Sequence, residues 1–110
     1  MKRITIEELP GWTPPKHYDL LVRTVTGQSN GVNQFNVGFA RMEKSGRCDA
    51  HVHEDMEQLF IVLKGAMMMK VEKEEFLLKP GQAVLVYRGE VHSNYNVSEE
   101  EETEYLTVTG

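Results

Sequence analysis

Three histidines have the chemistry and the spacing that a metal ion needs from a β-rich protein. His51 and His53 are separated by one residue, so on a strand both imidazoles project from the same face. His92 follows a turn that contains Gly89, and a closed sheet can bring it opposite the pair. Imidazole nitrogen is a good ligand for first-row transition metals. We therefore predict a site for one divalent transition metal ion (Zn, Fe, Ni or Mn) on these histidines.

A fourth ligand is expected from the oxygen-bearing side chains that follow the pair. Glu57 and Gln58 are sequence neighbours, so on a strand they face opposite sides and only one can join the histidines. The choice matters because glutamine adds no negative charge, so the metal keeps its full charge and polarises a bound oxygen more strongly. Strand parity alone leaves both side chains as candidates.

The other histidine is predicted to be a structural or surface residue, and the single cysteine a packing residue. His17 lies in a proline-rich segment, away from the other histidines in the sequence. Cys48 has the opposite parity to His51 and His53 if the strand is regular. We therefore expect Cys48 to face away from the metal, as a small packing residue and not a reactive thiol.

Further polar and sulfur-bearing side chains are candidates for the barrel interior. Asn94 and Asn96 share the parity of His92, so they can contact a ligand or make ordinary turn and strand bonds; both interpretations stay open. The three methionines at 67–69 cover both strand faces, and the inward ones are expected to line the barrel.

Short strands separated by turn residues must position these side chains. Each predicted strand is rich in β-branched and aromatic residues or alternates apolar with polar positions, and no segment has long helical periodicity. The pattern is typical of an all-β antiparallel barrel or jelly roll. Residues 1–17, broken by prolines, are predicted to form an N-terminal arm, and residues 18–110 one barrel domain. The predicted strands are 18–26, 35–42, 57–64, 66–71, 75–78, 83–87, 91–97 and 104–109.

One predicted strand is apolar on both faces. In residues 58–64, Phe60 and Val62 share one face, while Leu59, Ile61 and Leu63 share the other. An antiparallel strand with one wet face should alternate, so its outer face needs a cover. Because little of the chain remains to cover it, we predict a homodimer.

The stretch Gly46-RCDA-His51-V-His53-EDME-Gln58-LFIVLK-Gly65 resembles the first cupin motif, and Gly81-QAVLVYRGEV-His92-SNYN resembles the second. The resemblance identifies the chain as a small single-domain, RmlC-like cupin and implies a jelly-roll β-barrel. It implies a metal on His51, His53, His92 and Gln58, since only Gln58 has the family spacing from both flanking motif residues. Two departures are a Gly46–His51 interval one residue shorter than usual and a tyrosine, Tyr87, where the second motif has proline.

Composition excludes several classes of partner. The net charge is −5, from 12 Lys+Arg and 17 Asp+Glu, and no basic cluster exists, which argues against a nucleic-acid or membrane partner. The acidic run 99–102 is predicted to be a solvated loop. One cysteine cannot form an internal disulfide, and the N-terminus lacks an apolar signal core, so we expect a cytoplasmic protein.

The function expected from these features is that of a small metalloenzyme. The metal would act as a Lewis acid in an isomerase or lyase, or activate oxygen in a dioxygenase, on a small oxygenated metabolite such as a sugar acid, keto acid or phenolic acid. The alternative is a non-catalytic module that binds such a molecule. No general acid or base is identified, although Glu57 is a candidate if the strand bulges near the site.

Overall fold

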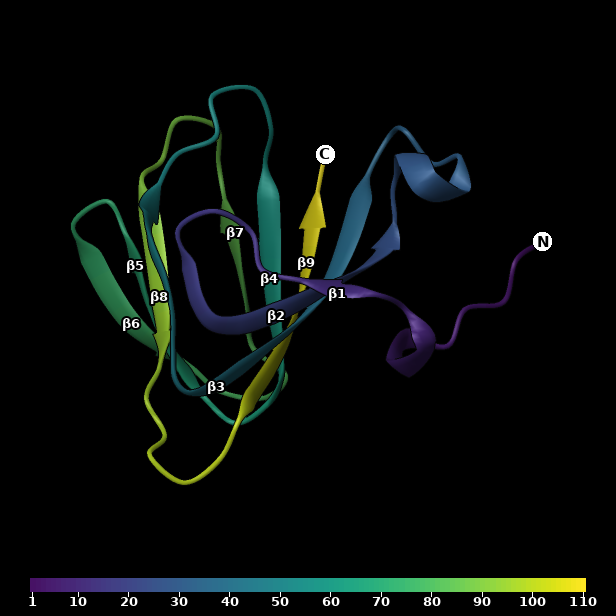
Figure 1. The fold of residues 1–110 in the computed structure, drawn as a ribbon. Coiled ribbons are helices and arrows are strands. Elements are labelled where there is room, and N and C mark those ends of the chain that lie inside the picture. Colours follow the sequence, from purple (N-terminus) through teal and green to yellow (C-terminus); the bar gives the residue numbers. More distant parts are fainter.

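The computed structural model describes residues 1–110 and consists almost entirely of antiparallel strands (Figure 1). Two short 3-10 helices, η1 and η2, flank the first long strand, and no helix is long or apolar enough to cross a membrane. The elements are η1 (Ile6–Glu8), β1 (Gly11–Trp12), β2 (His17–Thr26), η2 (Gln28–Asn30), β3 (Asn36–His51), β4 (Gln58–Lys64), β5 (Met67–Val71), β6 (Glu74–Leu78), β7 (Ala83–Val86), β8 (His92–Asn96) and β9 (Thr103–Thr109).

The strands form a nearly closed barrel in the order β6-β5-β8-β3-β9-β4-β7, with β2 and β1 added at β3. The long strand β3 connects the two halves of the barrel, because residues 36–42 pair with β9 and residues 47–51 pair with β8. Figure 1 shows β5, β6 and β8 on one side of the barrel and β4, β7 and β9 on the other. The predicted antiparallel all-β jelly roll is confirmed.

Strand β3 is nine residues longer at its C-terminal end than predicted, reaching His51 and not Met42. The residues that follow Met42 are polar on both faces of the strand, so no apolar alternation marks them as part of β3. Gly46 permits it: a Cβ at this position would lie 2.6 Å from the Asp19 carbonyl oxygen and 2.7 Å from the Met42 Cβ. Such distances exclude any side chain, so the glycine lets β3 cross close to β2 and carry His51 to the site.

The predicted N-terminal arm is partly ordered against the barrel. β1 pairs with β2, and His17 is the first residue of β2. The Arg23 guanidinium donates hydrogen bonds to the carbonyl oxygens of Glu7 (3.0 Å) and Leu9 (2.9 Å). These contacts hold η1 and β1 beside the sheet, so the segment that precedes β2 has a defined position at the barrel.

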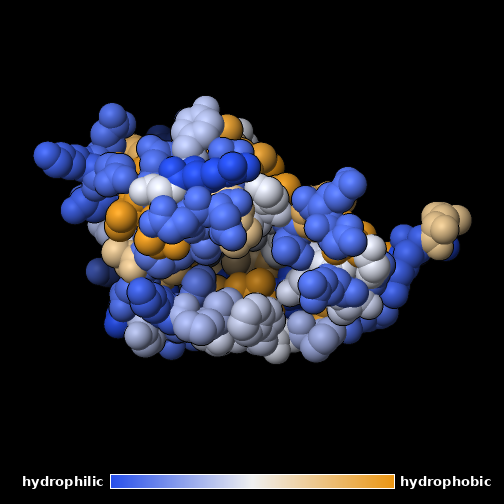
Figure 2. All heavy atoms as spheres, turned by 90° about the horizontal axis from the view of Figure 1, so that it is seen from above, coloured by the Kyte–Doolittle hydropathy of each residue, from blue (hydrophilic) through white to orange (hydrophobic).

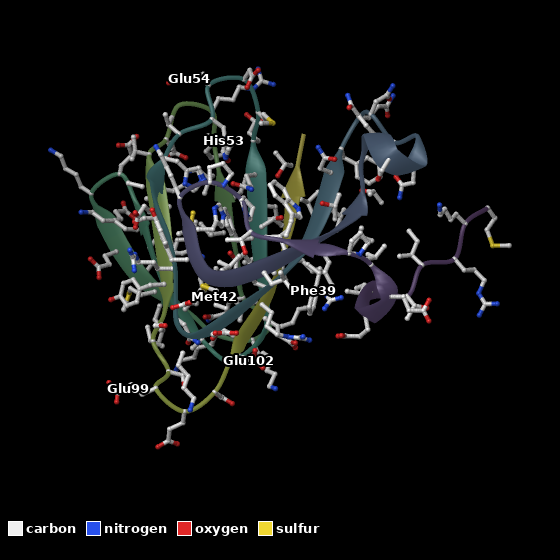
Figure 3. All side chains as sticks on the ribbon, viewed as in Figure 1. Phe39, Met42, His53, Glu54, Glu99 and Glu102 are labelled. Carbon is white, nitrogen blue, oxygen red and sulfur yellow. The ribbon has the colours of Figure 1, made fainter.

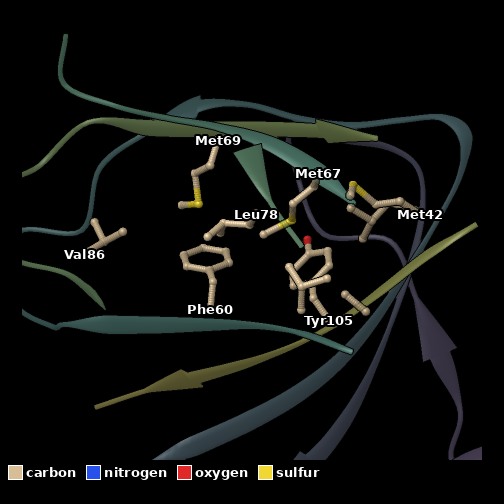
Figure 4. Packing of buried hydrophobic residues seen from close by; sticks show 10 residues of the cluster. Met42, Phe60, Met67, Met69, Leu78, Val86 and Tyr105 are labelled. Carbon is tan, nitrogen blue, oxygen red and sulfur yellow. The ribbon is translucent and has the colours of Figure 1, made fainter. Parts of the chain in front are cut away.

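The barrel interior is filled by sulfur-bearing and aromatic side chains from facing strands (Figure 4). Met67 and Met69 of β5 are fully buried, and Met68 between them is only half-buried, so the predicted inward methionines do line the barrel. Flexible thioether chains suit a narrow, irregular space of this kind. The other main members of the cluster are Met42, Phe60, Val62, Leu78, Val86 and Tyr105.

The two faces of β4 differ in burial. Phe60 and Val62 point into the core and are 3% and 0% exposed, whereas Leu63 on the outer face is 46% exposed. Leu85, from the neighbouring strand β7, is also 46% exposed. The outer face of β4 therefore continues across adjacent strands as an apolar surface, whose members are Leu59, Ile61, Leu63, Leu85, Leu106 and Val108.

Asn96, at the end of β8, holds together the end of the barrel that carries the acidic loop. Its side-chain amide donates to the carbonyl oxygens of Glu43 and Glu101, both at 3.0 Å. Its oxygen accepts from the Ser98 amide and from the Thr103 hydroxyl, both at 2.9 Å. Asn96 thus makes turn and strand bonds, which was one of its two predicted roles.

Replacing Asn96 by alanine is expected to lower the free energy of unfolding by about 3 kcal/mol, because buried partners lose their hydrogen bonds together. Urea denaturation followed by circular dichroism measures this change. Ser93→Ala, on the same strand, is the control and should change stability by less than about 0.5 kcal/mol. Equal effects of the two substitutions would contradict the anchoring role of Asn96.

Candidate metal centre

The three predicted histidines meet at one end of the barrel. His51, the last residue of β3, is directly opposite His92, the first residue of β8, in the strand register. Their ring centroids are 4.2 Å apart, and those of His51 and His53 are 5.0 Å apart. One nitrogen from each of the three imidazoles lies within 4.8 Å of the others. This spacing is suited to shared coordination of one ion.

Hydrogen bonds orient two of the imidazoles. Nδ1 of His51 lies 2.9 Å from the Asp49 carbonyl oxygen, and Nδ1 of His92 lies 3.0 Å from that of Glu90. A carbonyl oxygen only accepts, so Nδ1 carries the proton in both rings and Nε2 has the free lone pair. Nε2 of His92 is buried and has no hydrogen-bond partner. Backbone contacts of this kind fix the tautomer that a metal ligand needs.

Gln58 and Glu57 point in different directions. Gln58, the first residue of β4, donates from Nε2 to the Thr109 hydroxyl at 3.2 Å, and its Oε1 is buried without a partner. It lines the same cavity as the histidines. The Glu57 side chain is 42% exposed, and its Oε2 lies 3.7 Å from Nε of Arg88. Of the two candidates for the fourth ligand, only Gln58 therefore reaches the cavity.

The environment favours neutral imidazoles. Burial lowers the pKa of His53 and of His92, and the nearby His51 lowers both further. A neutral imidazole has a lone pair to give to a metal, whereas a protonated one repels it. The lowered pKa values of His53 and His92 thus favour the protonation state that coordination requires.

The cavity in front of the histidines has a volume of about 400 Å³. Apolar groups form much of its wall, and among them Phe60 also packs on the His92 ring with centroids 5.8 Å apart. Asn94 lies on the wall and its side-chain amide donates to the Tyr105 hydroxyl at 3.3 Å. Asn94 therefore borders the cavity, whereas Asn96, on the same buried face of β8, does not line it. Viewed from the end with the His53–Glu54 loop, hydrophobic atoms lie in a depression between hydrophilic groups (Figure 2).

The prediction for the orientation of Cys48 is wrong. Its Sγ lies 3.4 Å from Nδ1 of His51, and the residue lines the cavity. The strand register shifts between Cys48 and His51, so β3 is irregular there and alternation fails. Nothing in the local sequence marks this irregularity. The packing role is consistent with the surroundings, because burial and Asp49 raise the pKa of Cys48 to about 12 and keep the thiol protonated.

His17, predicted to be structural, also lines the cavity. Its Nδ1 lies 2.7 Å from the Pro15 carbonyl oxygen, so this ring too has Nε2 as its free acceptor. Its centroid is 6.0 Å from that of His51, and it lies outside the group of three clustered nitrogens. His17, His51 and His92 each have Nδ1 against the carbonyl oxygen of the residue two positions earlier. His17 is therefore oriented in the same way, but it lies beside the cluster and is not part of it. No spacing to the other histidines in the sequence could have revealed it.

Comparison with known proteins agrees with the barrel fold. Residues 38–109, which include every clustered histidine, match the family model described as "Cupin domain". The chain belongs to the cupin family. In this cupin the first glycine–histidine motif runs from β3 into β4, and the second runs through β7 and β8.

Several individual proteins are similar to this cupin. It is 36% identical over 75 residues to quercetin 2,3-dioxygenase of Bacillus subtilis (strain 168), a match covering 68% of this chain but 22% of that protein. The structure of the polyketide cyclase RemF from Streptomyces resistomycificus is 23% identical, with a TM-score of 0.83 over 99% of this chain and 78% of that chain. A predicted oxalate decarboxylase from Thermotoga maritima is 14% identical, with a TM-score of 0.85 over 98% of this chain and 97% of that chain. The two structures share the fold, and the dioxygenase is far longer than the matched segment.

Proposed function

We propose that this cupin binds one divalent transition metal ion (Zn, Fe, Ni or Mn) through His51, His53, His92 and Oε1 of Gln58. One observation carries the proposal: the buried side-chain atoms without a hydrogen-bond partner are Gln58 Oε1 and His92 Nε2. Buried polar atoms are normally satisfied, and an orphaned pair needs an explanation. Both belong to residues of the proposed ligand set, and a metal ion would satisfy both.

The proposed function is that of a small metalloenzyme, of the RmlC-like cupin kind, acting on a small oxygenated metabolite such as a sugar acid, keto acid or phenolic acid. The bound metal would supply Lewis-acid catalysis of isomerisation or elimination, or activation of oxygen. The chain's own groups orient the substrate: His17 offers a ring nitrogen as acceptor, and Thr107 lies on the same wall. The apolar wall, including Phe60, keeps water from the reacting atoms.

A binding module without turnover is the second candidate. The observation that favours it is the absence of an aspartate or glutamate from the cavity wall, since these are common general acids and bases. Turnover assays with a panel of sugar acids, keto acids and catechols, on protein loaded with each of the four metals, decide between the two. Turnover that is lost in Gln58→Ala supports the enzyme, and ligand binding without turnover across the panel supports the module.

Gln58→Ala is expected to weaken metal binding by about tenfold to a hundredfold, because it removes one neutral oxygen ligand and leaves the histidines. Glu57→Ala is the matched control and should leave the affinity within about twofold, since its side chain faces Arg88 at the surface. Isothermal titration with zinc measures both. A large loss in Glu57→Ala with none in Gln58→Ala would contradict the assignment.

We also propose a homodimer, formed through the apolar face of β4, and a cytoplasmic location that suits the free thiol of Cys48. Sedimentation velocity at micromolar concentration is expected to find a dimer, and Leu63→Glu with Leu85→Glu should convert it to a monomer. Both leucines are 46% exposed in the single chain, so the substitutions spare the core. A wild-type monomer would overturn the proposal.

A further inference from the structure

The cavity wall has an unusual charge composition. The chain contains 17 Asp+Glu, yet none of the 16 residues that line the cavity is acidic, and Lys16 is the one charged side chain among them. The acidic loop is remote, since Glu99 and Glu102 lie at the end of the barrel opposite to His53 (Figure 3). With a divalent ion on four neutral ligands, the cavity would be strongly positive inside an acidic protein. Such a cavity attracts an anion.

Lys16 is held at this wall by a tight turn. The His17 amide donates to the Pro14 carbonyl oxygen at 3.2 Å, and the Lys16 carbonyl oxygen accepts from the Asp49 amide at 2.8 Å. The φ of Lys16 is 63°, a left-handed conformation that glycine would adopt without strain. A lysine at this position is less favourable for folding than a glycine would be. Such a residue is a candidate for a functional role of its side chain.

Lys16 is an exposed residue that lines the cavity. None of the four ion pairs in the structure includes Lys16. His17, the next residue, is paired with Cys48 in the strand register, and the Cys48 thiol is 3.4 Å from Nδ1 of His51. Lys16 is therefore held on the part of the wall next to the proposed metal ligands.

We propose that Lys16 is a specificity-determining residue that selects ligands bearing a carboxylate. The inference rests on the proposed metal site, because the metal holds the other end of the ligand. Apolar side chains, among them Trp12, Val22 and Phe60, also line the cavity, so an attached hydrocarbon or aromatic group fits. A small hydroxy acid with an apolar substituent combines these features.

The test compares acids with their uncharged amides. Mandelate and mandelamide, and lactate and lactamide, are titrated into zinc-loaded protein and followed by isothermal titration and by amide chemical shifts. Lys16→Gln should lower the affinity for each acid by about fivefold and the affinity for each amide by less than about twofold. Lys16→Arg should keep the affinity for acids. Lys73→Gln, an exposed lysine outside this cavity, should behave as wild type.

The inference would be overturned if Lys16→Gln lowered the affinity for acids and amides equally, or if it lowered neither. It would also be overturned if neither acid bound to wild type. Elemental analysis separates this failure from that of the metal site, because zinc content is expected to be the same in Lys16→Gln and wild type. If wild type takes up no zinc, the proposed function fails, and titration of the acids into the zinc-free protein decides the role of Lys16. Shifts of the Lys16 and His17 amides that vanish in Lys16→Gln would then support it, and their absence would overturn it.

Discussion

Replacing His92 by alanine is expected to remove stoichiometric metal from the protein. The His92 side chain is 1% exposed, and its free Nε2 is one of the two orphaned buried atoms at the site. Loss of this ligand leaves two imidazoles and one amide oxygen, so affinity should fall by on the order of a hundredfold or more. Elemental analysis after reconstitution and gel filtration should find about one equivalent in wild type and almost none in the variant.

Because His92 is buried, a second variant separates loss of the ligand from loss of the fold. His53 is less buried, so His53→Ala removes one ligand with less damage to packing and should show the same loss. His17→Ala is the matched control, since His17 lies in the cavity but outside the cluster of three. Metal retained in both ligand variants, or lost in the His17 variant alone, would refute the proposed ligand set.

Removing the metal is expected to lower the melting temperature substantially. A ligand that binds only the folded state at a thousand times its Kd contributes about 4 kcal/mol, which for a domain of this size corresponds to roughly 15 °C. The site joins β3, β4 and β8, so the ion would link strands from both sides of the barrel. Differential scanning calorimetry with zinc and with a chelator measures the shift.

The same calorimetry on His53→Ala provides the control. Since this variant should bind no metal at these concentrations, its melting temperature should be the same with zinc and with chelator. If the chelator lowers the melting temperature of the variant as much as that of wild type, its effect is unrelated to the site. If the melting temperature of wild type is the same with zinc and with chelator, the ion does not stabilise the barrel.

Much of the barrel could be predicted from local patterns. The strands over residues 58–64 and 103–109 begin and end within one residue of their predicted limits, because apolar alternation and turn residues are local properties of the chain. The β3 extension to His51 was missed since its residues are polar on both faces and are held by pairing with β8, a partner distant in sequence. Pairing between distant strands is not visible in a local pattern.

For the site, the histidine set could be predicted from residue spacing. The one-residue spacing of His51 and His53, and the second motif around His92, are enough to bring their nitrogens within 4.8 Å, because strand periodicity and barrel closure leave little freedom. The residues that surround the histidines depend on the folded chain. An irregularity in β3 turned Cys48 toward His51, and a proline turn brought Lys16 and His17 to the wall. Both depend on backbone geometry and on contacts between distant segments, which residue types and spacing do not specify.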